Sequence, residues 1–594
     1  MESCSGSYPY FPLNKVGFRY IILQPGAFDT NIKCSLVQDV DGTDKTPYEA
    51  LSYVWGKSTD TIPIDIDGVR FPVTVNLESA LRHLRRPTEA RRLWVDAVCI
   101  NQDDLNERAE QVCRMKSIYE HAQNVVIWLG REDEPVKVYK KYDRPIEDAF
   151  QLAKDIAAIP SQNDLEDLLS SVASKDAFMV LSRLFDRTWF ERVWVLQELV
   201  AAARADVVCG KSSIPWSTFE DAYAQLDEFF SEEIYGDWVF LDSAFRDWWR
   251  PVFNRFSVLR QQLAGRWAHP GLEHAILFTL GTFITELNAT DDRDRLWGVI
   301  SLIAHDGPID AALAPDYRNP APRVFADLAR RLIAGTGSLA TLHACDHVAA
   351  DNQPSWAPSW TRINRPVHLL HATTPLRPPG PIPSISFAGD GVLRARGVRL
   401  GAVRAVTPAC VVENRGTASW TTAFAPLFSG WEAGLWRVVD GDGGGGGDEK
   451  AFRDACREAF LFGFEMGTRT RDENCSTYDM LLGRAGRPAR EIVVGDVSVL
   501  DMFAARAVRN VHEQCAFVTD GGCVGRTYDD ANDAWVGDWV CCLQGAYAPL
   551  LLRPAEEEDK FWFVGTCVLS GFMDLDVQAD ILGREEELRY FDLI

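Results

Sequence analysis

The chain has 594 residues, more than a single hydrophobic core usually serves, so two or three domains are expected. Its 46% hydrophobic and 25% charged residues are typical of soluble globular proteins and argue against bulk disorder. The 85 acidic residues outnumber the 61 Lys and Arg, and a formal charge of -24 repels phosphate backbones and anionic lipids, which argues against nucleic acid as a partner.

The N-terminal segment MESCSGSYPYFPLNKVGFRYIIL has no basic region followed by an apolar one, so no signal peptide is expected. No apolar run is long enough to cross a bilayer. The 14 cysteines are scattered without the spacing of metal ligands, which predicts reduced, mostly buried thiols and no metal site. Together these features predict a cytoplasmic protein that requires no cofactor.

From residue 48 onward, short β-branched or aromatic runs alternate with helical patterns. The first strand is expected over 50–56, followed by a helix that Asn76 caps and whose apolar residues recur with helical spacing. A second strand is expected over 93–100. Asp104 and Glu107 resemble a capping box that opens the next helix, and a third strand is expected over 124–129.

A helical stretch over about 146–172 leads to two helices that meet near Thr188, and 206–210 is expected to be the last strand. This order predicts an α/β fold with a mostly parallel, flavodoxin-like sheet flanked by helices in an N-terminal domain of residues 1–215. Ligands of such sheets bind beyond the carboxyl ends of the strands, so the loops after Tyr53, Asp96 and Leu129 are of interest.

Residues 216–350 are expected to be helical, with amphipathic segments near 217–230, 271–287, 293–304 and 322–334. Residues 351–594 predict a small β-rich domain, because short strand patterns occur both before and after a long insertion over about 410–512. The Gly-rich tract 441–447 inside the insertion predicts a flexible surface loop.

Three segments resemble the signature motifs of the fungal HET (heterokaryon incompatibility) family. They are YEALSYVWG at 48–56, LWVDAVCINQDDLNERAEQVCRMKSIYEHAQNVVIWLG at 93–130 and WFERVWVLQEL at 189–199. They occur in order and nearly complete. A looser similarity continues through 289–302, 354–360 and 537–553, with Asp292 where many relatives carry proline.

The resemblance implies a role in fungal nonself recognition, in which the HET domain triggers programmed cell death. HET domains also resemble, more distantly, the Toll/interleukin-1 receptor (TIR) domains, whose enzymatic members cleave NAD at the nicotinamide-ribose bond. The segment WVLQEL, 194–199, resembles the TIR segment that carries the catalytic glutamate, so the resemblance points to Glu198 as the catalytic residue and to NAD as the candidate substrate. It also implies self-association through the HET domain and an incompatibility partner protein.

Glu198 is expected on a helix with apolar residues one turn before and after it. An apolar setting raises the pKa of a carboxyl group, and a carboxylate beside a ribose can stabilise an oxocarbenium-like transition state. Alternatively, Glu198 pairs with an arginine such as Arg192 or Arg108 and only braces the sheet. Both readings are open on the sequence alone.

The other candidate site residues bind substrate in this reading. Tyr53 and Trp55 lie at or just past the end of the first strand, where aromatic rings could stack on a nicotinamide or adenine. Buried Tyr and Trp are more often core anchors, so packing is the favoured interpretation for at least one of them, and Trp55 is the better ligand candidate. Gly56 permits a sharp turn or a close approach of backbone to a ligand. Trp194, one turn before Glu198, completes the aromatic candidates.

A polar group at the second strand supplies the remaining candidates. Asp96 is expected in mid-strand, with Asn101 and Gln102 at the strand end, where they could bind ribose hydroxyls or a carboxamide. The alternatives are that Asp96 hydrogen-bonds loop amides and that Asn101 forms an Asx turn.

Two further segments are assigned structural roles. The run GGCVGRT at 521–527 is expected to be a hairpin turn, because its spacing and Arg526 do not fit a phosphate-binding loop. Residues 291–295 are expected to be a solvated helix start with local ion pairs.

Two functions remain in competition. One is a NAD-consuming hydrolase, and the other is a non-catalytic module that signals death by self-association or partner binding.

Overall fold

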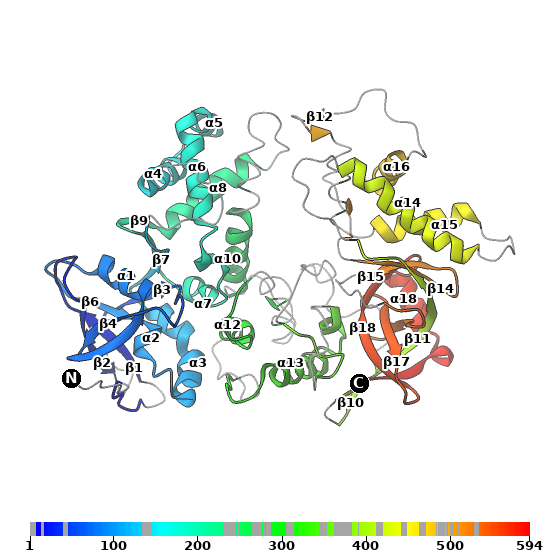
Figure 1. The fold of residues 1–594 in the computed structure, drawn as a ribbon, viewed down its shortest axis with the longest axis horizontal. Helices are drawn as coiled ribbons and strands as arrows, with labels where there is room; N and C mark the ends of the chain where they lie inside the picture. Colours follow the sequence, from blue (N-terminus) through cyan, green and yellow to red (C-terminus); the bar gives the residue numbers. More distant parts are fainter. Residues whose placement is uncertain are drawn as a thin grey trace. The chain divides into compact units, whose positions relative to one another are not determined.

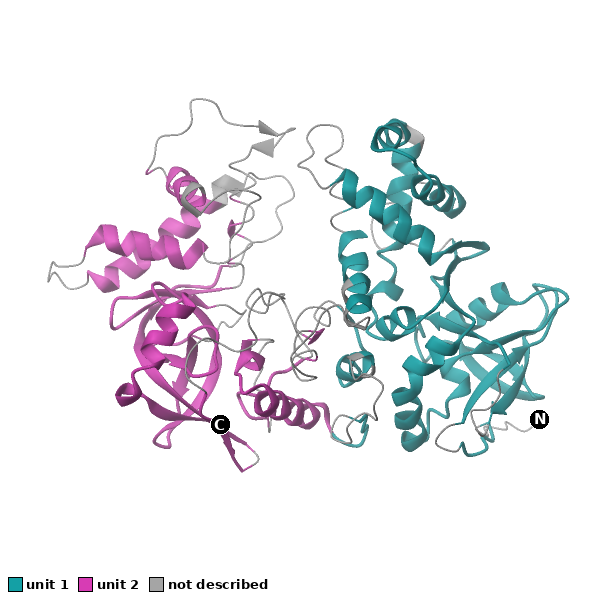
Figure 2. Ribbon diagram, turned by 180° about the vertical axis from the view of Figure 1, so that it is seen from behind, with its two compact units in different colours: residues 1–268, 287–319 teal, residues 269–286, 320–594 magenta. Residues whose placement is uncertain are grey.

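The computed structural model describes most of the chain. The described residues are 8–13, 17–39, 46–132, 145–230, 245, 249–263, 276, 279–280, 287–303, 314–343, 353–360, 383–389, 391–410, 420–440, 448–461, 471–482, 484, 493–494, 497–498, 504, 507–508, 511, 514–527 and 534–594. The chain divides into two compact units (Figure 2). Unit 1 comprises 1–268 and 287–319, and unit 2 comprises 269–286 and 320–594.

A nine-stranded sheet forms the centre of unit 1 (Figure 1). Its four central strands are parallel neighbours, and antiparallel strands extend it on both sides. In spatial order the strands are β5 (Val69–Thr74), β4 (Thr61–Ile66), β2 (Lys33–Asp39), β1 (Phe18–Leu23), β6 (Arg91–Trp94), β3 (Glu49–Tyr53), β7 (Asn124–Trp128), β8 (Ala205–Cys209) and β9 (Ser212–Pro215).

The sheet confirms the predicted α/β fold and corrects its strand content. It is mixed, since β1 pairs antiparallel with both β2 and β6, and β4 pairs antiparallel with β5. The parallel centre is buried on both faces and therefore reads as continuous apolar runs, such as the fully buried last four residues of β7. The outer strands are partly exposed, with a weaker pattern that the interpretation of the sequence did not include.

Helices accompany this sheet throughout unit 1. Helix α3 packs against α7 and α12, and α4 packs against α6 and α8. The helices are α1 (Val75–Leu84), α2 (Asp96–Cys99), α3 (Leu105–His121), α4 (Ile146–Ala157), α5 (Gln162–Ser170), α6 (Val172–Leu184), the 3-10 turn η1 (Thr188–Glu191), α7 (Val195–Val200), α8 (Trp216–Phe229), α10 (Arg250–Leu263) and α12 (Asp294–Ile303).

Of the two helix N-caps predicted from the sequence, one is confirmed and the other is wrong. Asp104 caps α3 by accepting hydrogen bonds from the backbone N–H groups of Asn106 and Glu107, as expected. Thr74, not Asn76, caps α1, because the Asn76 amide instead donates to the carbonyl of Val54 and accepts from Trp128.

The segment 93–100 is not one strand as expected. Strand β6 ends at Trp94, and the four-residue helix α2 begins at Asp96. The β-branched run that favours a strand is interrupted because the side chain of Cys99 accepts a hydrogen bond from Val95 N–H, closing a local turn. Asp96 therefore lies beyond the strand end instead of within it.

The segment directly after β9 is helical, with α8 followed by α10. An aromatic core formed by Phe185, Trp216, Phe219, Trp249 and Phe253 holds α6, α8 and α10 together, with ring centroids 4.8–6.1 Å apart along the chain of contacts. Most of the amphipathic segment predicted over 271–287 falls outside the described residues.

Unit 2 contains a closed six-stranded barrel. Strand β11 pairs with β14, and the antiparallel pairing continues through β15, β18, β17 and β16 back to β11, so these strands leave no open edge. Glycine at 397 permits the closure, because a side chain there would collide with the carbonyl of Cys542 on β16. The barrel strands are β11 (Val392–Val406), β14 (Ala516–Thr519), β15 (Val524–Thr527), β16 (Trp539–Leu543), β17 (Leu550–Pro554) and β18 (Lys560–Leu569).

The barrel confirms the predicted β-rich C-terminal region. The separate strand patterns GVLRARGV and LGAVRAV, at 391–398 and 400–406, form one long bulged strand, β11. Gly522, with φ of 79°, turns the β14–β15 hairpin that was expected at 521–527. The remaining strands are β10 (Ile385–Ala388), β12 (Val493–Val494), β13 (Val497–Ser498) and β19 (Arg589–Leu593), which pairs with β11 and β18.

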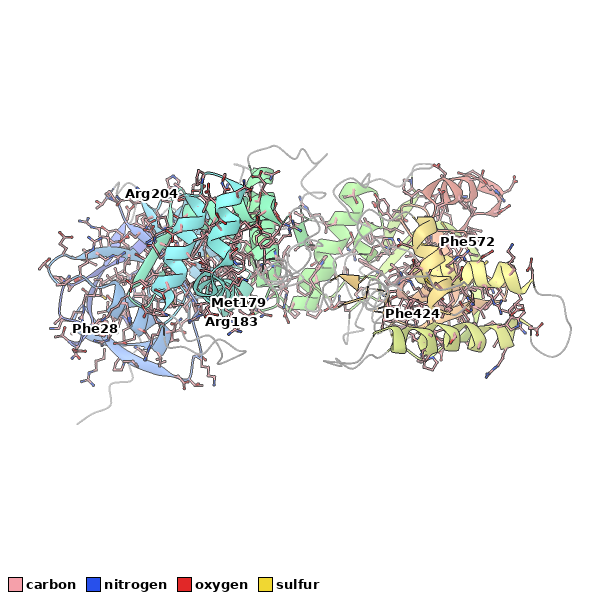
Figure 3. All side chains as sticks on the ribbon, turned by 90° about the horizontal axis from the view of Figure 1, so that it is seen from above. Phe28, Met179, Arg183, Arg204, Phe424 and Phe572 are labelled. Atoms are coloured by element: carbon pink, nitrogen blue, oxygen red, sulfur yellow. The ribbon has the colours of Figure 1, made fainter. Side chains whose placement is uncertain are left out.

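The insertion between β11 and β14 contains three helices and the short β12–β13 hairpin among its described residues. It has its own apolar core against the barrel strands β14 and β15. Phe424 on α14 is one of its fully buried residues (Figure 3). The Gly-rich tract at 441–447 lies outside the described residues. The helices of unit 2 are α13 (Ala321–Thr336), η4 (Ala340–His343), α14 (Trp420–Val439), α15 (Glu449–Leu461), α16 (Arg471–Leu481), α18 (Leu575–Leu582) and η6 (Glu585–Glu587).

Within the described parts of the chain, no helix has the length and apolar character that a bilayer crossing requires.

Candidate functional site

The candidate residues are positioned by the carboxyl end of β3 and by the helices that follow β6 and η1. Strand β3 ends at Tyr53, and α2 begins at Asp96 just after the neighbouring parallel strand β6. Helix α7 brings Glu198 to the same strand. The residues that three distant segments contribute thus meet at the edge of the sheet where α/β folds bind ligands.

Glu198 lies in the interior, where a chain of two hydrogen bonds connects it to Ser52 and, through Ser52, to Trp189. Its side chain is 1% exposed, and its carboxylate accepts a hydrogen bond from the Ser52 hydroxyl. Ser52 itself is buried in β3, and its hydroxyl oxygen accepts a hydrogen bond of 2.7 Å from the Trp189 indole N–H. A serine in mid-strand therefore links the indole on η1 to the carboxylate on α7.

Arg192 is the arginine beside Glu198. Its Nη1 atom lies 3.7 Å from Oε1 of Glu198 and also donates to the carbonyl of Tyr53. Arg108, the other arginine considered from the sequence, instead lies over the Tyr317 ring, with 3.8 Å between its guanidinium carbon and the ring centroid. The bracing contact expected in the alternative interpretation is thus present, and Arg192 makes it.

Burial raises the pKa of Glu198 from 4.5 to about 7, against the opposing effects of the Arg192 charge and the Ser52 hydrogen bond. The nearby negative charge of Asp96 raises the pKa further. A carboxyl group with this pKa exchanges protons near neutral pH, as a general acid or base does.

Asp96 is the second buried carboxylate of the cluster. Its Oδ2 accepts a hydrogen bond of 2.7 Å from the Trp55 indole N–H, and its Oδ1 accepts one of 2.7 Å from the backbone of Ala97. Burial raises the pKa of Asp96, while Arg192 opposes the shift. Arg192 therefore acts electrostatically on both carboxylates, Asp96 and Glu198.

The two aromatic residues after β3 differ in exposure. Tyr53 is 2% exposed, and burial raises the pKa of its hydroxyl well above the usual value. Trp55 is 37% exposed although its N–H is held by Asp96. Gly56, with φ of 79°, adopts a backbone conformation that favours glycine. Tyr53 is thus a packed residue, whereas Trp55 is exposed to solvent while its indole N–H is bonded to Asp96.

The two polar residues after α2, Asn101 and Gln102, make different contacts. The Gln102 side-chain amide donates to the carbonyl of Asp96 at 3.1 Å and so belongs to the cluster. The Asn101 side chain accepts a hydrogen bond from Asp103 N–H, the Asx turn considered as the alternative, and its backbone N–H donates to Glu107.

Trp194 lies in a second buried group. Its indole N–H donates to Asp294 at 3.2 Å, and the Tyr317 hydroxyl donates to the other oxygen of the same carboxylate at 2.8 Å. Burial raises the pKa of Asp294 to about 6. Local ion pairs were expected over 291–295, and Arg293 pairs with Asp291. The expected solvated helix start is wrong for Asp294, which is only 6% exposed.

Ser52, Trp189 and Asp294 were not among the site residues predicted from the sequence. Ser52 had a usable signal, since it is the polar residue within the apolar run of ALSYVWG and must find a hydrogen-bond partner when buried. Asp294 had none, because an acidic residue in the run DDRDR is typical of a solvent-exposed helix start. Among the described residues, no group of three or more His, Cys, Asp and Glu is arranged to hold a metal ion.

Comparisons with known proteins show which family the sequence is similar to. The family model described as "Heterokaryon incompatibility protein (HET)" matches residues 48–198, a segment that contains Ser52, Asp96, Arg192 and Glu198. The chain is also 26% identical to "Heterokaryon incompatibility protein 6, OR allele" of Neurospora crassa over 644 aligned positions, which cover 91% of each chain. No solved structure matches the chain.

Proposed function

We propose that this protein is an effector of fungal nonself recognition whose HET domain triggers programmed cell death, because residues 48–198 match the heterokaryon incompatibility (HET) family model. The relative in Neurospora crassa carries heterokaryon incompatibility in its name, and its similarity extends through 91% of this chain.

The proposed chemistry is hydrolysis of NAD at the nicotinamide-ribose bond. The bond between the ribose C1′ atom and the nicotinamide nitrogen breaks, and the nitrogen keeps the bonding electrons. Water oxygen bonds to C1′, and the products are ADP-ribose, nicotinamide and a proton. A carboxylate beside the ribose stabilises the positive charge that develops on the sugar, as in glycoside hydrolysis.

One observation supports this proposal most directly. Glu198 is a buried carboxyl group with a pKa of about 7, and it lies beside Asp96 and Arg192. The partly exposed Trp55 is hydrogen-bonded to Asp96. In this arrangement Trp55 stacks on the nicotinamide or adenine ring, Gln102 contacts the substrate amide or ribose, and Glu198 acts on the sugar.

The proposal includes a rearrangement. Glu198 is 1% exposed and held by Ser52 and Arg192, so Arg192 must move before the carboxylate can contact a ribose. Arg192 is 17% exposed and lies at the rim of the cluster. We propose that self-association of the HET domain displaces Arg192 and so makes the carboxylate accessible only in the assembled state.

The same burial favours a second candidate function. A carboxylate sealed by a serine and an arginine can serve only to hold α7 against β3, and the HET domain would then transmit the death signal by binding itself or a partner protein.

A cell-death assay separates the two. The full-length protein and its Glu198→Gln and Glu198→Ala variants are expressed in a fungal host, and viability and cellular NAD are followed, with Glu166→Ala on the exposed face of α5 as the matched control. The enzymatic function predicts killing with loss of NAD by the wild type and the control only. Killing by Glu198→Gln at the wild-type level, with NAD unchanged, would instead establish the binding function.

A further inference from the structure

Helix α7, which carries Glu198, has little to hold it in place by itself. It has six residues, Val195–Val200, and its N-cap residue Trp194 makes no side-chain capping hydrogen bond. Isolated helices of this length are unstable in water, so the position of α7 depends on the residues packed around it.

A segment far along the chain contacts the backbone just before α7. Residues 287–319 belong to unit 1, whereas the residues on either side of them belong to unit 2. The described residues of this segment, 287–303 and 314–319, are hereafter called the clip. Asn288 forms a parallel β-bridge with Arg192, and its carbonyl accepts a hydrogen bond of 3.1 Å from Val193 N–H. Gly298 lies so close to Val193 that an added Cβ would be 2.9 Å from its Cγ2 atom.

The clip also binds two side chains at the start of α7. Asp294 accepts the indole N–H of Trp194 at 3.2 Å, and the carbonyl of Trp297 accepts the side-chain amide of Gln197 at 2.8 Å. Gln197 is fully buried, so its bond is shielded from water, whereas the bond between Trp194 and Asp294 is partly buried. These contacts fix the residues directly before Glu198 and one turn earlier.

The other end of the clip is attached to α3. Tyr317, which donates to the free oxygen of Asp294, stacks under the guanidinium of Arg108 on α3 at 3.8 Å. Arg293 donates to the carbonyl of Tyr317 at 2.7 Å and pairs with Asp291. Asp294 thus lies at the junction between α3, the clip and Trp194.

We propose that the clip completes the HET domain from outside the matched segment 48–198, and that Asp294 is a positioning residue that holds α7 so that Glu198 faces Ser52 and Arg192. Only the expected effect of Asp294 on activity rests on the proposed function. The expected effect of the clip on the order of α7 does not, and it is measured independently.

The test uses the full-length chain and four variants. Asp294→Ala removes the acceptor of both donors, Trp194→Phe removes one donor while keeping an aromatic ring, and Asp294→Asn keeps one acceptor oxygen. Asp292→Ala is the matched control, because this aspartate lies two residues away on the clip with its side chain 47% exposed.

Hydrogen exchange at the amides of α7 should be at least about tenfold faster in Asp294→Ala and Trp194→Phe than in the wild type, with exchange in α1 unchanged. Asp294→Asn should show an intermediate rate and Asp292→Ala the wild-type rate. For NAD cleavage, Asp294→Ala should lower kcat by about tenfold or more with KM within about twofold, and Asp294→Asn should restore part of kcat.

Wild-type exchange of α7 in Asp294→Ala would overturn the proposal whatever the activity. So would faster exchange with unchanged kcat in a protein whose Glu198→Gln variant is inactive, because Asp294 would then not position the reactive group. If Glu198→Gln retains full activity, the proposed catalytic function is wrong, and the exchange rates alone still decide whether the clip holds α7.

Discussion

At the scale of single residues, Ser52 connects the parts of the site. It is the acceptor for Trp189 and the donor for Glu198, and it is fully buried in β3. A buried hydrogen-bonding group that loses its partner costs more free energy than the bond itself contributes. The position of Ser52 therefore sets the stability of the cluster as well as the protonation of Glu198.

Ser52→Ala should lower the free energy of unfolding by about 1–3 kcal/mol, because it leaves the Trp189 N–H and one Glu198 oxygen without this partner. Denaturant unfolding followed by tryptophan fluorescence measures the change. Ser170→Ala, which removes an exposed hydroxyl that bonds within α5, should change the value by less than about 0.5 kcal/mol. Equal effects of the two substitutions would show that Ser52 is not a shared partner.

The raised pKa of Glu198 predicts how stability depends on pH. The folded protein binds this proton more tightly than the unfolded chain does, so the contribution to stability is complete below pH 4.5 and is lost as pH rises through about 7. Between pH 5 and pH 7 the contribution of this group should fall by roughly 2–3 kcal/mol. The difference in unfolding free energy between wild type and Glu198→Gln should follow this curve, whereas the difference for Glu166→Gln should be flat.

The residues of the site were predictable to the extent that they lie in the motifs. Trp55, Asp96, Gln102 and Glu198 meet in one cluster, as strand ends of a parallel sheet predict. The separation of Asn101 and Trp194 from it was not predictable, because their partners Asp103 and Asp294 depend on local turn geometry and on a segment about a hundred residues away.

At the scale of elements, the parallel strands were predictable and the antiparallel strands that flank them were not included. Strand β1 lies between β2 and β6, although it precedes all three signature motifs. Its Arg19 is 1% exposed and forms a bidentate pair with Glu107 on α3, at 2.6 and 3.1 Å. Glu107 was expected to complete a capping box, but this buried pair takes its carboxylate instead.

Arg19→Ala should lower the free energy of unfolding by about 3–5 kcal/mol, because it leaves the Glu107 carboxylate buried without its cation. Arg86→Ala, which breaks an exposed pair with Glu89, should cost less than about 1 kcal/mol. Thermal and denaturant unfolding of both variants measure the contrast. A loss below 1 kcal/mol in Arg19→Ala would show that β1 is not held to α3 through this pair.

At the scale of the whole molecule, the chain consists of two compact units whose boundaries do not follow the sequence continuously. Unit 1 extends beyond the matched segment 48–198 at both ends and includes the clip, and unit 2 contains the barrel with its helical insertion. Sequence patterns predicted the classes of both parts. They could not predict that 287–319 returns to unit 1, because its amphipathic helix pattern is equally compatible with packing in either unit.

We propose that Glu198 is the reactive group of a NAD hydrolase. Purified full-length protein, fused to a tag that forces clustering, is incubated with NAD at pH 7 while nicotinamide release is followed. We expect the wild type to release nicotinamide and Glu198→Gln to release it at a rate lower by about a hundredfold or more. Glu166→Gln should be as active as the wild type. No release by the clustered wild type, or equal release by Glu198→Gln, would contradict this proposal.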